Sequence, residues 1–256
     1  MTKFEKFQAL HKAKDLFILP NAWNVESAII FQKNNFSAVA TSSAAVAATL
    51  GYGDGEKMPF TEYMLIISRM AASINVPLTV DLEMGYGTSD ELIYQNIEKL
   101  LAVGVVGINI EDSVITKGVR SLKEPNSFGQ TITFIKDKLS RHRQSLFINV
   151  RCDTYLLDVK DKKDETSHRI QLYEKAGADG IFLPFITEED DIVKAVTSTK
   201  LPLNVMAIAG LPATPILQRL GVRRISMGPF LHSKSYNFAN ELAKNVIESN
   251  SIQSIL

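Results

Sequence analysis

Cysteine and histidine are scarce in this sequence. It has one cysteine, Cys152, and four histidines among 256 residues. A single cysteine excludes an intramolecular disulfide and a cysteine-rich zinc site. The histidines lie in or next to predicted helices rather than at the ends of predicted strands, namely His11, His142, His168 and His232. A zinc site or another imidazole-ligated metal site is therefore not expected.

The sequence also lacks a charge excess and long apolar runs. Its 28 basic residues balance its 28 acidic residues. Bulk charge therefore does not suggest a nucleic acid or a membrane surface as a partner. No apolar stretch is long enough to span a bilayer, and residues 1–7 lack the apolar core of a signal peptide. We expect a cytoplasmic protein without a membrane or nucleic-acid partner.

Apolar segments alternate with helical patterns along the whole chain. After a short helix that ends near residue 14, the predicted strands are 16–20, 36–41, 77–81, 105–110, 146–150, 180–184, 203–206 and 224–227. The predicted helices are 25–33, 60–74, 89–103, 127–143, 160–175, 188–196, 215–220 and 236–248. Apolar strands without alternation are typical of a parallel sheet that is buried on both faces. Eight such units predict one (β/α)8 barrel domain over residues 1–256, and we expect the polar segment 113–125 to be mobile.

Polar residues collect where the predicted strands end. In a barrel, functional residues lie at these carboxyl ends and on the loops that follow them. The candidates are Asn21, Trp23, Ser42, Ser43, Asp54, Asp81, Glu83, Glu111, Asp112, Arg151, Asp153, Asn204 and Met206. Opposite charges at one mouth suit an anionic substrate that binds through a divalent metal.

The segment 80–87 is the strongest of these signals. Asp81 and Glu83 are spaced i, i+2, so they share one side if the strand extends to Glu83, and Gly85 and Gly87 permit a sharp turn. A site of carboxylates without imidazole favours Mg²⁺ and allows Mn²⁺. We expect Asp81 to bind the metal directly. Glu83, Glu111 and Asp54 are the acids expected to hold its water ligands.

Structural roles are the alternatives for these same residues. The end of the 77–81 strand could be an ordinary solvated turn. Glu111 and Asp112 could cap a helix or form a solvated pair. Arg151 could form a structural ion pair with Asp153 or Glu111.

Seven short segments, taken in order, resemble the isocitrate lyase/phosphoenolpyruvate mutase superfamily. They are NAW at 21–23, TSSA at 41–44, LGYGDG at 50–55, DLEMGYG at 81–87, GINIED at 107–112, NVRCD at 149–153 and PLNVM at 202–206. The resemblance runs from about Leu19 to Pro229 and covers most of the chain. The ordered set is more specific than any one motif in it.

This resemblance implies a barrel whose last helix is exchanged between subunits of a homodimer or homotetramer. It implies a Mg²⁺-dependent site for a small 2-oxo or 2-hydroxy carboxylate. Asp81 matches the direct metal ligand, and Glu83, Glu111 and Asp54 match acids that orient metal-bound water. The predicted catalytic residues are Asp54, Glu111 and Arg151. The predicted substrate-binding residues are Trp23, Ser42, Ser43, Ala44, Arg151 and Asn204.

The chain departs from the family's patterns after the Glu111–Asp112 pair. The lyases of the family carry a catalytic cysteine in a KKCGH motif there, and this chain has SVITKGVR at 113–120. The mutase and its hydrolase relative carry a lysine directly after the acidic pair, where this chain has Ser113. Lys117, Arg120 and Lys123 are candidates for the missing acid or cation. Cys152 follows Arg151 at the end of the predicted 146–150 strand and not on this loop, and we interpret it as structural.

The leading hypothesis is a Mg²⁺-dependent lyase that cleaves a carbon–carbon bond of a 2-oxo or 2-hydroxy carboxylate through an enolate. The missing loop motif disfavours isocitrate itself. One alternative is a hydrolase or mutase that acts on the P–C bond of a phosphonate. Another is a non-catalytic barrel that binds a metabolite. A barrel with unrelated chemistry, such as phosphate binding at Gly210 and Gly228, ranks lowest.

Overall fold

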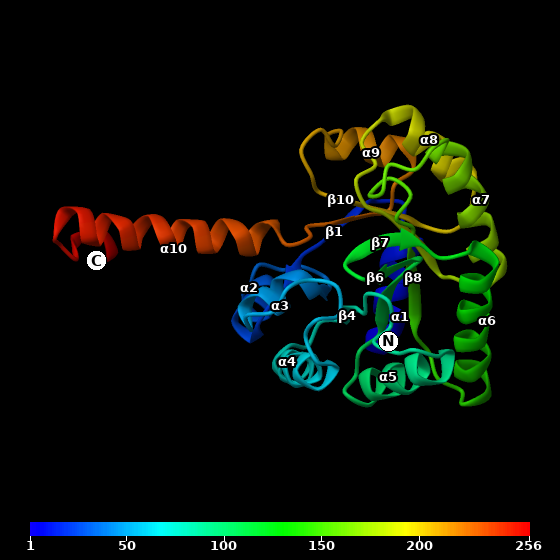
Figure 1. The fold of residues 1–256 in the computed structure, drawn as a ribbon, viewed down its shortest axis with the longest axis horizontal. Helices are drawn as coiled ribbons and strands as arrows, with labels where there is room; N and C mark the ends of the chain where they lie inside the picture. Colours follow the sequence, from blue (N-terminus) through cyan, green and yellow to red (C-terminus); the bar gives the residue numbers. More distant parts are fainter.

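A ring of parallel strands forms the centre of the computed structural model, which describes residues 1–256 (Figure 1). Only Pro20 separates the first two strands, of which β1 pairs with β11 and β2 pairs with β3. They therefore act as one strand position, and the predicted (β/α)8 barrel is confirmed. The strands are β1 (Phe17–Leu19), β2 (Asn21–Ala22), β3 (Val39–Thr41), β4 (Leu78–Asp81), β5 (Gly107–Glu111), β8 (Phe147–Arg151), β9 (Gly180–Leu183), β10 (Leu203–Met206) and β11 (Arg224–Ser226).

Helices follow the strands around the ring. They are α2 (Val25–Lys33), α3 (Ser43–Thr49), α4 (Phe60–Ser73), α5 (Asp90–Ala102), α6 (Pro125–Arg141), α7 (Lys162–Lys175), α8 (Glu189–Thr197), α9 (Thr214–Leu220) and α10 (Phe230–Ser249). Several begin at side-chain caps that their sequences supply. Ser89, for example, accepts a hydrogen bond from the backbone N–H of Leu92 at the start of α5. The short α3 was not expected, because it begins directly where β3 ends.

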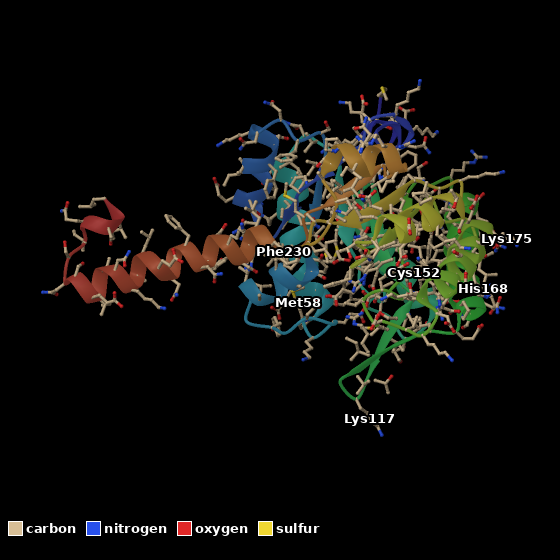
Figure 2. The ribbon with its side chains drawn as sticks, turned by 90° about the horizontal axis from the view of Figure 1, so that it is seen from above. Met58, Lys117, Cys152, His168, Lys175 and Phe230 are labelled. Carbon is tan, nitrogen blue, oxygen red and sulfur yellow. The ribbon has the colours of Figure 1, made fainter.

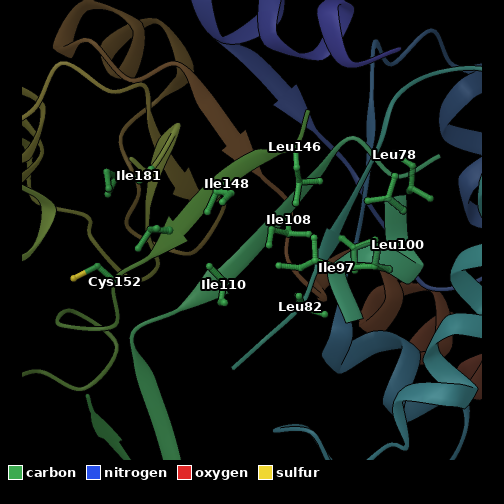
Figure 3. Close-up of a cluster of buried hydrophobic side chains, with 14 of the residues drawn as sticks. Leu78, Leu82, Ile97, Leu100, Ile108, Ile110, Leu146, Ile148, Cys152 and Ile181 are labelled. Atoms are coloured by element: carbon green, nitrogen blue, oxygen red, sulfur yellow. The ribbon is translucent and has the colours of Figure 1, made fainter. Parts of the chain in front are cut away.

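The two faces of the ring differ in chemistry. Ile108 and Ile110 of β5 and Ile148 of β8 belong to a core of 45 buried residues shared with the helices (Figure 3). Successive side chains of a strand point to opposite faces. The residues that alternate with these isoleucines, Asn109 and Asn149, therefore point into the ring. The strands are buried on both faces, as predicted, but their inward positions are partly polar.

The helix α1 (Lys3–Lys12) covers the amino end of the ring. His11 on this helix is buried and stacks on Phe147, the first residue of β8, with 4.1 Å between ring centroids. Phe7 contacts the same ring edge-on at 5.4 Å. These aromatic contacts close the barrel at the end opposite the predicted site.

Segment 113–125 is not the mobile stretch that we expected. It contains an antiparallel hairpin of β6 (Ser113–Thr116) and β7 (Val119–Leu122). Lys117 and Gly118 both have positive φ, at 52° and 81°. Positive φ at both central residues is the geometry of a tight two-residue hairpin turn, which explains why this polar segment is ordered.

The last helix leaves the barrel. α10 begins at Phe230, six residues before the predicted start, and extends away from the ring (Figures 1 and 2). None of its 20 residues is buried. A short 3-10 turn, η1 (Gln253–Ile255), follows it. No helix in the structure combines the length and apolar character needed to cross a membrane.

Candidate active site

A cavity of about 500 Å³ opens at the carboxyl ends of the strands. Eight residues predicted at the strand ends or in the turns after them line it, namely Asn21, Ser42, Ser43, Ala44, Asp54, Asp81, Arg151 and Met206. They come from β2, β4, β8, β10 and the segments that follow β3, so the barrel brings together segments that are distant in sequence. The predicted mouth is therefore a real cavity with both acidic and basic walls.

A second groove of about 480 Å³ lies at the opposite end, beside α1. Its basic residues are Lys12, Lys200 and Arg223. Its one acid, Asp179, already forms an ion pair with Lys136 at 3.0 Å. Because barrel chemistry belongs to the carboxyl ends of the strands, we place the candidate active site in the first cavity.

Asp81 ends β4 and faces this cavity. The Ser43 hydroxyl donates to Oδ2 of Asp81 at 2.9 Å, whereas Oδ1 accepts no hydrogen bond from the protein. Thr41 and Tyr63 hold the Asp81 backbone through bonds of 3.0 Å each. Burial raises the pKa of the Asp81 carboxyl, and the charge of Arg151 opposes that rise. The result is a fixed carboxylate with one oxygen available to a ligand.

This arrangement fits Mg²⁺. No three histidine, cysteine, aspartate or glutamate side chains converge to hold an ion by themselves. A site with one protein carboxylate would leave most ligand positions to water and substrate, which is how Mg²⁺ usually binds. Asp54 lines the same cavity and is exposed, so it can reach metal-bound water.

Glu83 does not line the cavity. β4 ends at Asp81, and Glu83 itself has a positive φ of 51°, so the two acids do not share one side of a strand. Both Glu83 oxygens are occupied, one by the Tyr86 hydroxyl at 2.8 Å and one by the Glu56 N–H at 2.9 Å. Burial and the charges of Asp81 and Asp54 raise the pKa of Glu83 to about 8. The geometry therefore gives Glu83 a role in holding the turn.

Two arginines and two acids form a buried cluster beside Asp81. Arg151 donates from Nε to Asp153 at 2.6 Å, and its Nη1 lies 3.1 Å from Oε2 of Glu111. Arg120, which reaches in from β7, pairs through Nη1 with Glu111 and lies 3.4 Å from Asp153. The Ser113 hydroxyl donates to Asp153 at 2.5 Å. Both ion-pair partners that we considered for Arg151 are thus present, and Arg151 also lines the cavity.

Glu111 is the least satisfied acid of this cluster. Its Oε2 accepts no well-aligned hydrogen bond although it is buried. Burial raises the pKa of Glu111 to about 7, against the lowering effects of Arg151 and Arg120. This oxygen therefore has the charge of Arg151 Nη1 at 3.1 Å as its only near partner and keeps capacity for a further donor such as water. Its neighbour Asp112 instead makes structural contacts, accepting from Tyr173 at 2.7 Å and from Arg169 at 3.2 Å.

Trp23 and Asn204 lie outside the cavity lining. The Trp23 ring is buried against Phe31 and His232, with 6.4 and 5.3 Å between centroids. Asn204 lies deeper in the ring and donates to the Ser226 hydroxyl at 3.1 Å. Neither residue is placed to touch a ligand in this structure. Cys152 is fully buried in the core, as a structural residue would be.

The sequence did not predict the residues that form the floor of the cavity. Asn109 lines it, and Oδ1 of Asn109 accepts from Asn149 at 2.8 Å and from Arg224 at 2.9 Å. Its own amide NH₂ donates to no protein acceptor and is left for a ligand. Arg224 is 1% exposed and also bonds Asn204 and His11, but no carboxylate. The one available signal was the Asn109 side chain inside an otherwise apolar strand.

Known proteins resemble this chain over nearly its whole length. The family model described as phosphoenolpyruvate phosphomutase matches residues 7–247. An uncharacterised protein of Mycobacterium tuberculosis is 31% identical over 240 residues, which is 94% of this chain and 88% of the relative. The 2-methylisocitrate lyase of Escherichia coli is 26% identical over 238 residues, which is 90% of this chain and 79% of the lyase.

Solved structures agree with the barrel. A crystal structure described as a putative phosphonomutase from Burkholderia cenocepacia has a TM-score of 0.88 and 33% identity, covering 94% of this chain and 99% of that one. A phosphonopyruvate hydrolase, in complex with oxalate and Mg²⁺, has a TM-score of 0.88 and 21% identity, covering 100% of this chain and 90% of that one. At that identity, the second likeness concerns the fold alone.

Proposed function

This chain belongs to the phosphoenolpyruvate phosphomutase family, within the isocitrate lyase/phosphoenolpyruvate mutase superfamily, and we propose that it is a Mg²⁺-dependent lyase. Its substrate is a small 2-oxo or 2-hydroxy carboxylate, in which it cleaves a carbon–carbon bond through an enolate. The observation that carries the proposal is Asp81, whose free oxygen faces a cavity shared with Ser43 and Arg151.

Each of these residues has a defined task in the proposal. Mg²⁺ held by Asp81 would act as a Lewis acid on the oxygen where negative charge develops. Ser43 keeps the Asp81 carboxylate in one orientation. Arg151 presents its unbonded Nη2 to the substrate carboxylate, because its other two nitrogens face Asp153 and Glu111. Asp54 and Glu111 orient water around the ion.

Carbon–carbon cleavage is favoured over P–C cleavage by the contacts of Ser113. This residue stands where the phosphonate enzymes of the resemblance carry a lysine, and its hydroxyl is bonded to Asp153. The side chain at that position is therefore neutral, and the nearest cation is Arg120, whose Nη1 lies 2.7 Å from the Ser113 hydroxyl.

The test is calorimetric titration of oxalate into the protein with and without Mg²⁺. Oxalate resembles the planar enolate of a 2-oxo acid, so the substrate need not be known. We expect binding that requires Mg²⁺ and is lost in Asp81→Ala. Asp190→Ala, which removes an exposed carboxylate on α8 that does not line the cavity, is the matched control and retains binding.

Failure of the wild type to bind oxalate with Mg²⁺ would overturn the proposal. Equal binding by Asp81→Ala would overturn the metal assignment. If oxalate binds as expected, product analysis on 2-oxo acids and phosphonopyruvate distinguishes the reactions. Phosphate release from phosphonopyruvate would favour the P–C alternative, and binding without turnover would favour a non-catalytic barrel.

We also propose that α10 packs against a second copy of the chain in a homodimer or homotetramer. The helix has no buried residue, yet it carries apolar side chains that are largely exposed, including Phe238 at 62% and Ile247 at 81%. A 20-residue helix of this kind gains stability by burying that surface. Light scattering should therefore give at least twice the chain mass of 28.4 kDa, and a monomer would contradict the proposal.

A further inference from the structure

The groove beside α1, at the amino ends of the strands, is lined by cations without ion-pair partners. This amino-end groove of about 480 Å³ is enclosed by α1, the start of β8 and the segments that precede β9, β10 and β11. Lys12, Lys200 and Arg223 line it, and none of the three forms an ion pair with a carboxylate. Three positive charges therefore face one groove without a counter-charge from the protein.

The same three side chains keep most of their donors free. Lys12 donates once from Nζ, to the amide oxygen of Gln8 at 3.1 Å. Arg223 donates from Nη1 to the Val222 carbonyl at 3.3 Å, and its Nε and Nη2 are unused. Lys200 donates to the protein only through its backbone N–H, so its Nζ is free. Ammonium and guanidinium donors are thus open to a ligand in the groove.

Two acids at the groove bond other groups. Asp179 is the only acid of the lining, and its two oxygens lie 3.1 and 3.0 Å from Nζ of Lys136. Glu174 contacts the rim from outside the lining, where one of its oxygens accepts from the Thr199 hydroxyl at 2.6 Å and the Lys200 N–H at 3.2 Å. The lining therefore keeps an excess of positive charge.

A further positive charge lies behind His11, which lines the groove. Nδ1 of His11 lies 2.9 Å from the Phe7 carbonyl oxygen, which can only accept, so Nε2 is left to accept from Arg224 at 3.3 Å. Arg224 is buried and bonds neutral groups alone. Because buried charges are usually paired, an anion in the groove would supply a charge that Arg224 lacks.

The remaining lining and the size of the groove suit an organic molecule. Its apolar residues are Phe147, Ala178, Val196 and Leu201. A volume of about 480 Å³ falls within the range of small-molecule sites, which combine apolar walls with a few polar groups. A bare inorganic ion would leave the apolar wall uncovered. The chemistry of the groove therefore fits a small molecule with an apolar part and an anionic group.

A phosphate ester is the anionic group that best matches several cations at once. Near pH 7 it carries about 1.5 to 2 negative charges, whereas a carboxylate carries one. Arginine binds phosphate through paired N–H donors, and lysine binds it as a point charge. Arg223 supplies the first kind of donor, and Lys12 and Lys200 supply the second.

We propose that the amino-end groove is a second ligand site, which binds a small phosphorylated organic molecule. The groove shares no lining residue with the candidate active site, so the inference does not depend on the proposed function. Binding in the groove requires neither Mg²⁺ nor Asp81. These two requirements separate a ligand of the groove from a ligand of the active site.

The experiment is calorimetric titration of the full chain with three matched pairs of probes, in phosphate-free buffer with EDTA. The pairs are AMP and adenosine, ribose 5-phosphate and ribose, and glycerol 3-phosphate and glycerol, whose members differ only by the phosphate. At least one phosphorylated probe should bind about tenfold or more tightly than its neutral counterpart, which is the usual effect of bonds to charged groups. Inorganic phosphate should bind more weakly than that probe.

Charge reversal of single lysines tests the position of the site. Lys12→Glu and Lys200→Glu change exposed lysines of the groove, and the control Lys6→Glu changes an exposed lysine of α1 outside the lining. Each groove variant should weaken the best probe by about tenfold or more. Lys6→Glu should weaken it by less than about threefold, because salt screens distant charges. Asp81→Ala should bind it as the wild type does.

Circular dichroism melting checks that each variant is folded, and Lys12→Ala or Lys200→Ala replaces a reversal that is not. Four results would overturn the inference. No phosphorylated probe binds better than its neutral counterpart, or inorganic phosphate binds as tightly as every ester. Lys6→Glu weakens binding as much as the groove variants do, which would indicate attraction by surface charge alone. Binding needs Mg²⁺ or Asp81, which would place the phosphate in the active site. Oxalate titration with Mg²⁺ tests the proposed function separately.

Discussion

Two arginines point into the same barrel and have opposite surroundings. Arg151, at the mouth, lies between the carboxylates of Glu111 and Asp153. Arg224, at the floor, bonds the neutral side chains of Asn109, Asn204 and His11. The nearby acids raise the pKa of Arg151, whereas burial lowers the pKa of Arg224 to about 9.

The difference shows what each end of the barrel is built to do. At the mouth, opposite charges are close together, and ligand groups can compete for the donors that remain. At the floor, amide and imidazole groups hold one arginine through hydrogen bonds, and the Phe7 and His11 rings of α1 pack against Phe147. The mouth is therefore suited to binding. The floor is suited to connecting the strands and to orienting the Asn109 side chain, which lines the cavity.

Replacing Arg151 should have the largest effect on stability. Arg151→Met leaves two buried carboxylates with fewer positive partners, and breaking a buried ion pair costs about 3 to 5 kcal/mol. We expect a loss of this size in urea unfolding at pH 8. The loss should shrink at pH 6, because Glu111, whose pKa is already raised to about 7, can then take up a proton. A loss that is independent of pH would argue against buried charge as its cause.

Replacing Arg224 should cost less. Arg224→Met is of similar length and removes a charge that has no carboxylate partner, leaving only neutral groups without a donor. We expect a loss of about 1 to 3 kcal/mol in the same urea unfolding assay. A loss larger than that of Arg151→Met would contradict the view that buried carboxylates make Arg151 the more important arginine for stability.

Asn109 is expected to donate a hydrogen bond from the floor of the cavity to the ligand. Asn109→Ala removes the one amide NH₂ of the floor that is free and lines the cavity. Loss of one hydrogen bond to an anion predicts about tenfold weaker Mg²⁺-dependent oxalate binding. The near-isosteric Asn109→Asp should also weaken it, because a carboxylate cannot donate the bond. Unchanged titrations in both variants would show that the floor does not touch the ligand.

The smallest expected effect concerns His11. Burial and the charge of Arg224 lower its pKa to about 3, so the folded protein keeps this ring neutral. The unfolded chain, with an ordinary histidine pKa near 6.5, binds more protons below that pH, and stability must fall as the pH falls. Between pH 7 and 5.5, the loss is about 1 kcal/mol. In His11→Phe this part of the pH dependence should disappear, which urea unfolding at the two pH values would show.

Much of the site was predictable because its residues lie at the ends of recognisable strands. Asp81, Arg151 and the Ser42–Ser43 turn each follow an apolar run, and in a barrel such ends meet at one rim. Glu83 was predicted at the cavity from the resemblance and from an i, i+2 spacing that holds only if the strand continues to this residue. The strand ends at Asp81 instead, and Glu83 adopts a positive φ. The spacing of residues in the sequence does not predict this backbone turn.

The positions of the hairpin and of the polar residues at the floor could not be predicted from strand ends. The polar composition of 113–125 resembles a loop, and only its packing against the loop at Gly55 places Arg120 beside Glu111. Asn109, Asn204 and Arg224 come from three strands that are distant in sequence, so their contacts depend on the register of the ring. Trp23 was assigned to the substrate from the resemblance, and its ring lies in the core instead.

The sequence by itself determined the order of strands and helices, the barrel and the acid that faces the cavity, because these depend on local periodicity and on where apolar runs end. The tertiary structure alone decided which polar side chains meet inside the ring. Ring closure and strand register bring Arg224 to Asn109 and Arg120 to Glu111, across separations that no local pattern encodes. The chemistry of this site therefore depends on which residues the closed ring of strands brings together.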